Sequence, residues 1–150
     1  MIKPSLIKRK NFISQEILVS KKTSKNINNI LRKVVTEKDG TANLADVNGY
    51  YVGGKTGTSQ NYQNKDENLN TFISIFPTKK PKYALLVMLE NPQVAKELIY
   101  DYRGMKIKGT RNEAGWNSVY VAGKIIKKIG PILAINSEEF NINYVAEKID

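Results

Sequence analysis

The chain has 150 residues, a formal net charge of +10, and neither cysteine nor histidine. This length fits one domain or a large part of one. Without cysteine and histidine there is no disulfide, no thiol nucleophile, no Ser-His-Asp triad and no zinc site built from these residues. Any catalysis must therefore use serine, threonine, lysine, tyrosine or carboxylate groups. We expect neither a metal site nor a cofactor.

The basic residues are spread along the chain, with small clusters at 8–10, 79–82 and 127–128. A pI near 9.7 favours anionic partners, but no tract is concentrated enough to predict one, and we expect no nucleic-acid partner. The longest apolar run, 83–89, is far shorter than the roughly 20 residues of a membrane span. Residues 1–4 lack an apolar signal region. We therefore expect that this chain neither exports nor anchors itself.

Residues 24–36 are predicted to form an amphipathic helix. Apolar residues recur there at helical spacing, at Ile27, Ile30, Leu31 and Val34. Ser20 or Thr23 is the expected N-cap, and Asp39-Gly40 supplies a turn after the last periodic residue.

Three strands are predicted next, at 48–58, 71–77 and 82–90. Their short links make the strands antiparallel. The run from Tyr83 to Leu89 is apolar at both parities, so we expect it to be buried on both faces and central in the sheet. Only one neighbouring strand is evident for it, which indicates a missing piece of sheet.

Residues 91–113 lack a clear period and are predicted to form a long polar excursion. A second helix is expected at 114–129, with one apolar stripe of Trp116, Val119, Ala122, Gly123, Ile126 and Ile129. Gly130-Pro131 should end this helix, and Trp116 and Ile126 should be shielded from solvent. The predicted fold class is α+β, an antiparallel sheet meander flanked by helices. Residues 136–150 form a tail without a structural prediction.

The most informative motif is Lys55-Thr56-Gly57, which allows two interpretations. Residues 49–56 spell G-x-x-x-x-G-K-T, the pattern of a phosphate-binding loop. Such a loop needs small, flexible residues and a helix that starts at the Lys-Thr pair. Here residues 50–52 are strand formers and no apolar helical stripe follows Thr56, so we reject nucleotide binding. In the second interpretation, a strand carries the lysine to a sheet edge that faces a cleft.

Five segments support the second interpretation: 30–36, 49–58, 71–77, 83–89 and 114–117. In order and spacing they resemble the C-terminal end of class B penicillin-binding proteins, most closely the septal cell-division peptidoglycan D,D-transpeptidases of the alphaproteobacterial type. The resemblance covers about residues 3–135. It implies that 1–135 is the C-terminal portion of a penicillin-binding transpeptidase domain, followed by the tail at 136–150.

The family resemblance implies roles for the residues around the motif. A serine of the complete domain attacks the D-Ala-D-Ala stem peptide of peptidoglycan, or a β-lactam that mimics it. Lys55 would supply positive potential and hydrogen bonds to an S-x-N serine and to the substrate carboxylate. Thr56 and Thr58 would bind that carboxylate, and the Thr58 amide would complete an oxyanion hole. Gly57 would admit the substrate backbone.

The family also requires an S-x-x-K and an S-x-N element. Residues 5–8 and 24–26 match these patterns in the right order, but we reject both as catalytic. Ser5 follows Pro4 near the terminus, where nothing precedes it to bury a nucleophile. Ser24 lies at the start of the first predicted helix, where a capping or first-turn role fits better. We therefore expect the nucleophile to lie upstream, and the chain alone to be inactive.

The resemblance also implies partners and a location. The expected partners are the remainder of the transpeptidase domain and, in the complete domain, the stem peptide or a β-lactam. The parent protein is expected at the inner membrane, facing the periplasm and associated with the divisome. The alternative function is a non-catalytic basic binding module for nucleic acid or a cell-wall polymer, which clustered lysines and aromatics on one surface would favour.

Overall fold

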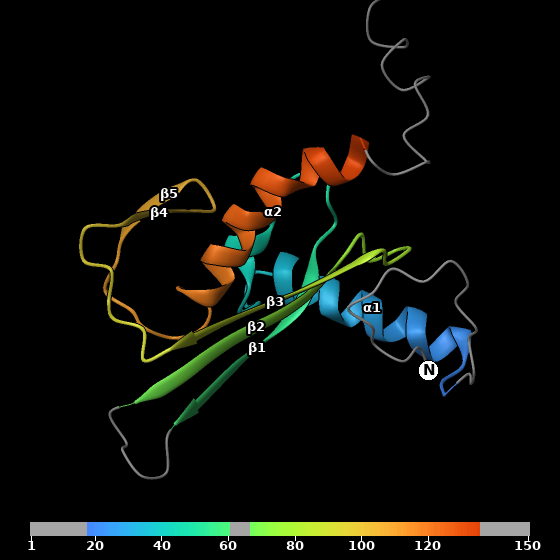
Figure 1. The fold of residues 1–150 in the computed structure, drawn as a ribbon, viewed down its shortest axis with the longest axis horizontal. Helices are drawn as coiled ribbons and strands as arrows, with labels where there is room; N and C mark the ends of the chain where they lie inside the picture. The colour runs from blue at the N-terminus through green and yellow to red at the C-terminus, as the bar shows by residue number, and fades with distance from the viewer. Residues whose placement is uncertain (1–17, 61–66, 136–150) are drawn as a thin grey trace, which may run out of the picture.

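The structure is a computed structural model that describes residues 18–60 and 67–135. The elements follow in the order α1 (Lys21–Thr36), the 3-10 helix η1 (Asn43–Ala45), β1 (Gly53–Gln60), β2 (Asn68–Phe76), β3 (Tyr83–Glu90), β4 (Ile99–Tyr102), β5 (Met105–Lys108) and α2 (Ser118–Ile135). Strands β1, β2 and β3 form an antiparallel sheet in that order, and β4 pairs with β5. Figure 1 shows α2 and the β4–β5 hairpin on one side of the sheet. The predicted α+β meander is confirmed.

Helix α1 begins three residues earlier than predicted, because Ser20 is its N-cap. The Ser20 hydroxyl accepts a hydrogen bond from the Thr23 amide at 3.0 Å, which satisfies one of the free amides of the first turn. The helix packs against the beginning of β1, where a Cβ on Gly53 would lie 3.0 Å from the backbone of Leu31 and Arg32. Glycine at this position therefore allows helix and strand to approach closely.

The sheet has two unlike faces, which follow from the alternation of side chains along each strand. We call the side that packs on α2 the core face; Phe72 and Val87 are paired there and share a buried cluster with Val119 and Ile126. The opposite side is the outer face, which consists of Gly53, Lys55, Gly57, Ser59, Leu69, Thr71, Ile73, Ile75, Ala84, Leu86, Met88 and Glu90.

Strand β3 does not have the environment that its composition predicted. It is an edge strand of the described sheet, and only Val87 in it is buried. Leu86 and Met88, on the outer face, are each 54% exposed. The prediction of burial on both faces is wrong for the described residues, because α2 covers only one side of the sheet.

Strand β1 starts at Gly53, five residues later than predicted. Gly49 and Tyr51 have φ angles of 85° and 49°, in the left-handed region that no strand can use. These residues form a turn instead. The Tyr51 carbonyl accepts a 3.0 Å hydrogen bond from the Thr78 amide, which ties the turn to the link between β2 and β3.

Helix α2 spans Ser118–Ile135 and not 114–129. Trp116 lies in the turn before the helix and is half-buried, whereas Ile126 is buried as predicted. Pro131 lies inside the helix, so the predicted stop at Gly130-Pro131 is wrong. Gly130 has no Cβ to clash with the proline ring, and Leu133 beyond it packs on the core cluster. This contact of Leu133 favours continuation of the helix past Pro131, which cannot donate a helical hydrogen bond.

The polar excursion at 91–113 contains the β4–β5 hairpin, which the sequence did not predict. Tyr100 of β4 is only 2% exposed and packs edge-on against Trp116 and Tyr120, with ring centroids 5.4 and 5.0 Å apart. The Tyr102 hydroxyl donates a 2.8 Å hydrogen bond to Oδ1 of Asn43. These aromatic contacts fix the hairpin against α2 and η1.

Candidate functional site

The Lys-Thr-Gly motif lies in the middle of β1, which is an edge strand of the described sheet. Lys55, Thr56, Gly57 and Thr58 pair with Ile73, Phe72, Thr71 and Asn70 of β2. The strand continues to Gln60, so no helix starts at Thr56. A phosphate-binding loop requires that helix to present its amides. The geometry is therefore incompatible with nucleotide binding of that type.

The strand divides the predicted site residues between its two faces. Lys55 and Gly57 belong to the outer face, and Thr56 and Thr58 to the core face. Lys55 is exposed, and its Nζ donates a 2.7 Å hydrogen bond to the Thr56 carbonyl. The four residues thus share one strand, but their side chains do not line one common pocket.

Gly57 has a local structural reason to be glycine. A Cβ at this position would lie 2.5 Å from Oγ1 of Thr71, a distance that real Cβ atoms do not tolerate. The same Thr71 hydroxyl donates a 3.2 Å hydrogen bond to the Gly57 carbonyl. Close pairing with β2 therefore requires glycine here, in addition to the substrate-related role that the family resemblance implies.

Thr56 and Thr58 line a hollow of about 420 Å³ on the core-face side of β1. One wall comes from the turn after α1, where the Thr41 hydroxyl is hydrogen-bonded to the Thr56 hydroxyl at 3.0 Å. A Cβ on Gly115 would lie 2.6 Å from the Thr41 carbonyl. The glycine thus lets the loop before α2 lie directly against this turn.

A second wall of the hollow includes an aromatic pair, Tyr102 and Trp116, that the sequence did not predict. Trp116 and Tyr102 have ring centroids 5.4 Å apart, tilted by 31°. The Arg111 guanidinium lies over the Trp116 ring at 5.3 Å, within the range of a cation–π contact. The x-Tyr-x-Tyr alternation at 99–102 is typical of a strand and could have predicted β4, which carries Tyr102. Trp116 was expected instead on the apolar stripe of α2.

Two ionisable groups near this wall have shifted pKa values. Burial, followed by the nearby Tyr120 hydroxyl, raises the pKa of Tyr100 above its ordinary value. The hydrogen bond and charge of Lys106 lower the pKa of Asp101, with 2.8 Å between Nζ and Oδ2. Both shifts belong to the β4–β5 hairpin and its packing, and neither group lines the hollow.

The rejected motifs lie away from the hollow or outside the described residues. Ser24 is exposed in the first turn of α1, and its amide donates to the Ser20 carbonyl at 3.0 Å. It lines a separate depression together with Lys25 and residues 78–81, at the end of β1 where the strand begins. Residues 5–8 lie outside the described residues.

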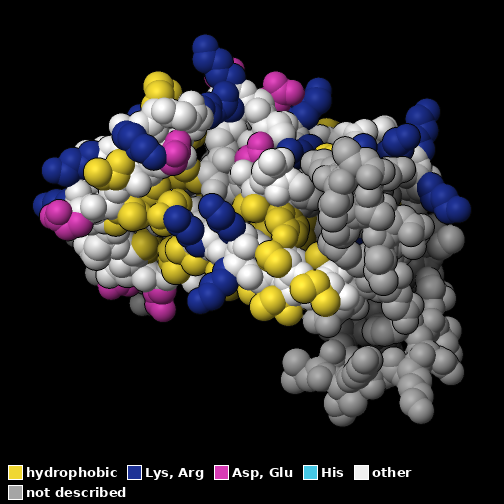
Figure 2. All heavy atoms as spheres, turned by 90° about the horizontal axis from the view of Figure 1, so that it is seen from above, with side chains coloured by type: hydrophobic (Ala, Val, Ile, Leu, Met, Phe, Trp, Pro, Cys, Tyr) yellow, Lys and Arg dark blue, Asp and Glu magenta, His cyan; other side chains and the backbone are white. Residues whose placement is uncertain are grey.

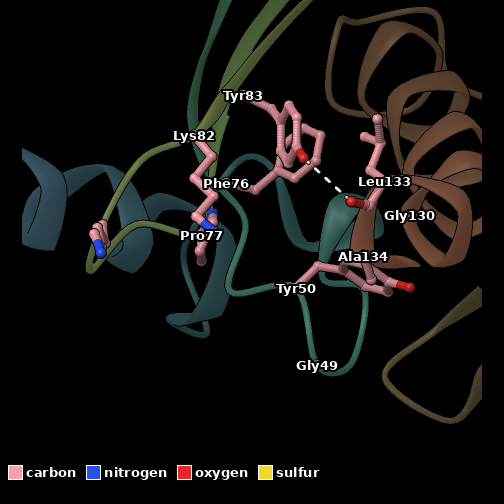
Figure 3. A pocket seen from close by; sticks show the side chains of 10 residues that line it. Gly49, Tyr50, Phe76, Pro77, Lys82, Tyr83, Gly130, Leu133 and Ala134 are labelled. Carbon is pink, nitrogen blue, oxygen red and sulfur yellow. Dashed lines mark hydrogen bonds between the residues drawn. The ribbon is translucent and has the colours of Figure 1, made fainter. Parts of the chain in front are cut away.

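Figure 3 shows a second cavity, of about 240 Å³, between the last turn of α2 and the end of β2. Tyr50, Phe76 and Tyr83 line it, and the Tyr83 hydroxyl donates a 3.3 Å hydrogen bond to the Leu133 carbonyl. A Cβ on Gly130 would lie 2.3 Å from the Tyr50 ring. The cavity accompanies the packing of α2 on the sheet, at the opposite end of β2 from Asn70.

The described part of the chain contains no group of acidic side chains placed to bind a metal ion. Neither of its two α-helices has the length and apolar character that a membrane crossing requires.

Comparison with known proteins identifies the family. Residues 1–110 match the family described as the penicillin binding protein transpeptidase domain. The chain belongs to this family. This confirms the resemblance inferred from the Lys-Thr-Gly strand and its neighbours.

Two curated members of the penicillin-binding protein family illustrate the likeness. The probable peptidoglycan D,D-transpeptidase FtsI of Caulobacter vibrioides is 31% identical over 134 residues, which is 79% of this chain and 20% of the relative. Stage V sporulation protein D of Bacillus subtilis is 29% identical over 140 residues, which is 91% of this chain and 19% of the relative. The chain thus spans about a fifth of each and matches their C-terminal part.

Solved structures agree with the family assignment. The transpeptidase domain of FtsI4 from Legionella pneumophila has a TM-score of 0.54 and 28% identity, and the match covers 73% of this chain and 35% of that domain. The D,D-transpeptidase domain of a peptidoglycan glycosyltransferase from Eggerthella lenta has a TM-score of 0.51 at 20% identity, which supports the fold. The α+β arrangement is therefore that of penicillin-binding transpeptidase domains.

Proposed function

We propose that this chain supplies one wall of the active site of a peptidoglycan D,D-transpeptidase of the septal, cell-division type. The observation that carries the proposal is the position of Lys55 on an edge strand, on the face of the sheet that α2 leaves uncovered. The reaction is serine acyl transfer to D-Ala-D-Ala stem peptides, with the nucleophile supplied by the remainder of the domain. Residues 1–135 form the C-terminal portion of that domain, and 136–150 follow as a tail.

The outer face supports the presence of a partner segment. Ile73, Leu86 and Met88 are 53–54% exposed and adjacent in register, since Ile73 pairs with Leu86 and Met88 lies two residues further along β3. A contiguous apolar surface of this kind usually marks an interface. Covering it removes apolar area from water and brings the partner next to Lys55. The remainder of the transpeptidase domain is the partner that we propose.

Each residue of the motif has a role in the proposed site. The Lys55 ammonium supplies positive charge on the outer-face side, where it faces the S-x-N serine of the partner segment. The Thr56 and Thr58 hydroxyls bind the substrate carboxylate from the core-face side, and the Thr58 amide donates to the oxyanion. Gly57 keeps the backbone between them accessible. The substrate would occupy the free edge of β1, because a ligand that lies along this edge can reach side chains of both faces.

The proposal includes a biological setting, which the likeness to FtsI and stage V sporulation protein D supports. The substrate is the peptidoglycan stem peptide, with β-lactams as inhibitors, and the complete protein is membrane-anchored, faces the periplasm and works within the divisome. Catalysis needs neither a metal nor another cofactor, because serine, lysine and backbone amides suffice for acyl transfer.

A chimera tests the proposal. Residues 18–135 replace the matching C-terminal part of the Caulobacter FtsI relative, and the second-order rate of acylation by a fluorescent penicillin is measured. Lys55→Ala should slow acylation by about 10²–10³-fold, as loss of a transition-state donor does. Lys25→Ala, in the rejected S-x-N match, is the control and should change the rate little. Unchanged acylation in Lys55→Ala would refute the role of Lys55.

The isolated chain completes the test. Without the partner segment it should form no covalent penicillin adduct, because the exposed Ser24 has no buried lysine to take its proton. A denaturation-resistant adduct on Ser24 or Ser5 would show that a rejected motif is the nucleophile. Mass spectrometry of the labelled peptide distinguishes the two serines.

The alternative, a basic binding module, has weaker support. In Figure 2 the Lys and Arg side chains are scattered over the visible face among polar and apolar groups. One depression is lined by Lys21, Lys25, Lys79 and Lys80 but by no aromatic residue, and Tyr51 is the one ring that lies near these lysines, at 5.5 Å from the Lys79 Nζ among the described residues. Polymer-binding sites usually combine both. We therefore retain the transpeptidase proposal and expect no binding of nucleic acid.

A further inference from the structure

Arg111 is a cation held in a defined place beside the threonines of β1. Its guanidinium lies over the Trp116 ring at 5.3 Å, and Trp116 is itself fixed by contacts with Tyr100 and Tyr102. Arg111 is exposed, and no carboxylate of the described residues pairs with it. The cation–π contact uses the charge of the guanidinium and none of its N–H groups as conventional hydrogen-bond donors, so these donors remain available to a ligand.

The hollow lined by Arg111 also contains the Thr56 and Thr58 hydroxyls. Lys55 belongs to the opposite face of β1, so it does not share this space. Lys38, Asp39 and Glu113 line the hollow as well, and together with Arg111 they give it no net formal charge. Binding of an anion here therefore depends on directed hydrogen bonds and not on a general attraction of negative charge.

We propose that Arg111 is a substrate-binding residue that holds the terminal carboxylate of the peptide, together with the hydroxyls of Thr56 and Thr58. A planar guanidinium matches a carboxylate with two parallel hydrogen bonds. This inference rests on the proposed function, which supplies the substrate class. It adds a residue outside the Lys-Thr-Gly strand and assigns the carboxylate to the core-face side of β1, while Lys55 serves the outer-face side.

The experiment measures binding without acylation, in the full 150-residue chain. N-acetyl-D-Ala-D-Ala and its C-terminal amide are titrated, and Trp116, the single tryptophan of the sequence, reports binding by its fluorescence. Calorimetry measures the same binding independently, because a substitution near Trp116 can change its fluorescence without changing the affinity. The wild-type chain should bind the acid about tenfold more tightly than the amide, as expected for loss of a charge-assisted hydrogen bond. Inorganic sulfate should compete poorly.

Three variants decide the result. Arg111→Gln should remove the preference for the acid, and Arg111→Lys should retain only part of it, because lysine keeps the charge but not the planar pair of donors. Lys124→Gln is the matched control: Lys124 also lies over an aromatic ring, Tyr120, at 5.1 Å, but does not line the hollow. Its preference should stay at the wild-type value. Urea unfolding confirms that all variants are folded.

Equal binding of acid and amide by the wild-type chain, no binding of either, or an unchanged preference in Arg111→Gln would each overturn the inference. These outcomes are separate from those for the proposed function. The chimera with Lys55→Ala tests acyl transfer, whereas the dipeptide titration tests only where the carboxylate binds. A carboxylate preference that depends on Arg111, combined with acylation that ignores Lys55, would retain the binding site and refute the enzymatic role.

Discussion

Gly123 in α2 controls how closely this helix approaches the turn that carries Thr41. A Cβ at position 123 would lie 2.5 Å from the Leu44 carbonyl oxygen and 3.2 Å from the Ala45 Cα. The first distance is roughly 1 Å shorter than an ordinary contact of about 3.5 Å. Both neighbours are backbone atoms of η1, so no side chain can rotate away to make room.

Replacing Gly123 with alanine has two opposite effects on stability, one from helix propensity and one from packing. Alanine in a helix interior is favoured over glycine by about 1 kcal/mol. Overpacking a close backbone contact costs about 1–3 kcal/mol, and here it also disturbs Ala45, which is fully buried. Because backbone atoms cannot move aside, we expect a cost in the upper part of this range, about 2–3 kcal/mol, so that Gly123→Ala lowers the free energy of unfolding by about 1–2 kcal/mol.

Urea unfolding of the full chain, followed by circular dichroism, measures this change. Lys127→Ala is the control, because Lys127 is exposed on the same helix and should change stability by less than about 0.5 kcal/mol. Trp116 fluorescence should also change in Gly123→Ala, since η1 and the Thr41 turn support the hollow. A Gly123→Ala variant as stable as the wild type or more stable would refute the reasoning, because helix propensity would then outweigh the contact.

Two further predictions concern pH and nucleotides. The pKa of Tyr100 is raised above 10.0 in the folded chain by burial and by Tyr120, so the unfolded state loses its proton first and stability falls as pH rises from about 10 through the folded pKa. Thermal unfolding between pH 8 and 11 should show this fall reduced in Tyr100→Phe, and equal slopes would contradict it. Calorimetry should detect no micromolar binding of ATP or GTP, and binding lost in Lys55→Ala would contradict the strand assignment of the motif.

Local sequence patterns predicted the parts of the fold whose partners are close in the chain. The apolar spacing at 27–34 predicted α1, and the succession of three strands with short links predicted the antiparallel order of β1, β2 and β3. Both depend on contacts within or between consecutive elements. The absence of a helical stripe after Thr56 correctly excluded a phosphate-binding loop, whereas the strand formers expected at 50–52 lie in or next to the turn before β1.

Contacts between distant segments account for the errors. The continuation of α2 through Pro131 depends on Gly130, which lies against Tyr50, eighty residues earlier in the chain. The burial of Tyr100, which fixes the β4–β5 hairpin, depends on Trp116 and Tyr120. No local period contains this information, because the stabilising surface comes from elsewhere in the fold.

In the candidate site, too, the residues that come from distant segments were not predicted. The sequence predicted Lys55, Thr56, Gly57 and Thr58 as one group, since they are consecutive. It did not predict Arg111 or the aromatic pair of Tyr102 and Trp116, because a residue that reaches β1 from the loop before α2 leaves no signal near position 55. The hydrogen bond between Thr41 and Thr56 is equally long-range and was equally inaccessible.

The division of the motif between two faces has a consequence for the proposed mechanism. Lys55 and the two threonines cannot serve one ligand from the middle of the sheet, because the strand backbone separates them. At an edge strand the backbone is open on one side, so a ligand that lies along this edge reaches side chains from both faces and also the unpaired amides of the strand. A peptide has the shape and the hydrogen-bonding groups for this position. Under the proposed function, the placement of the motif on β1, and not on the central strand β2, would allow the lysine and the threonines to act together.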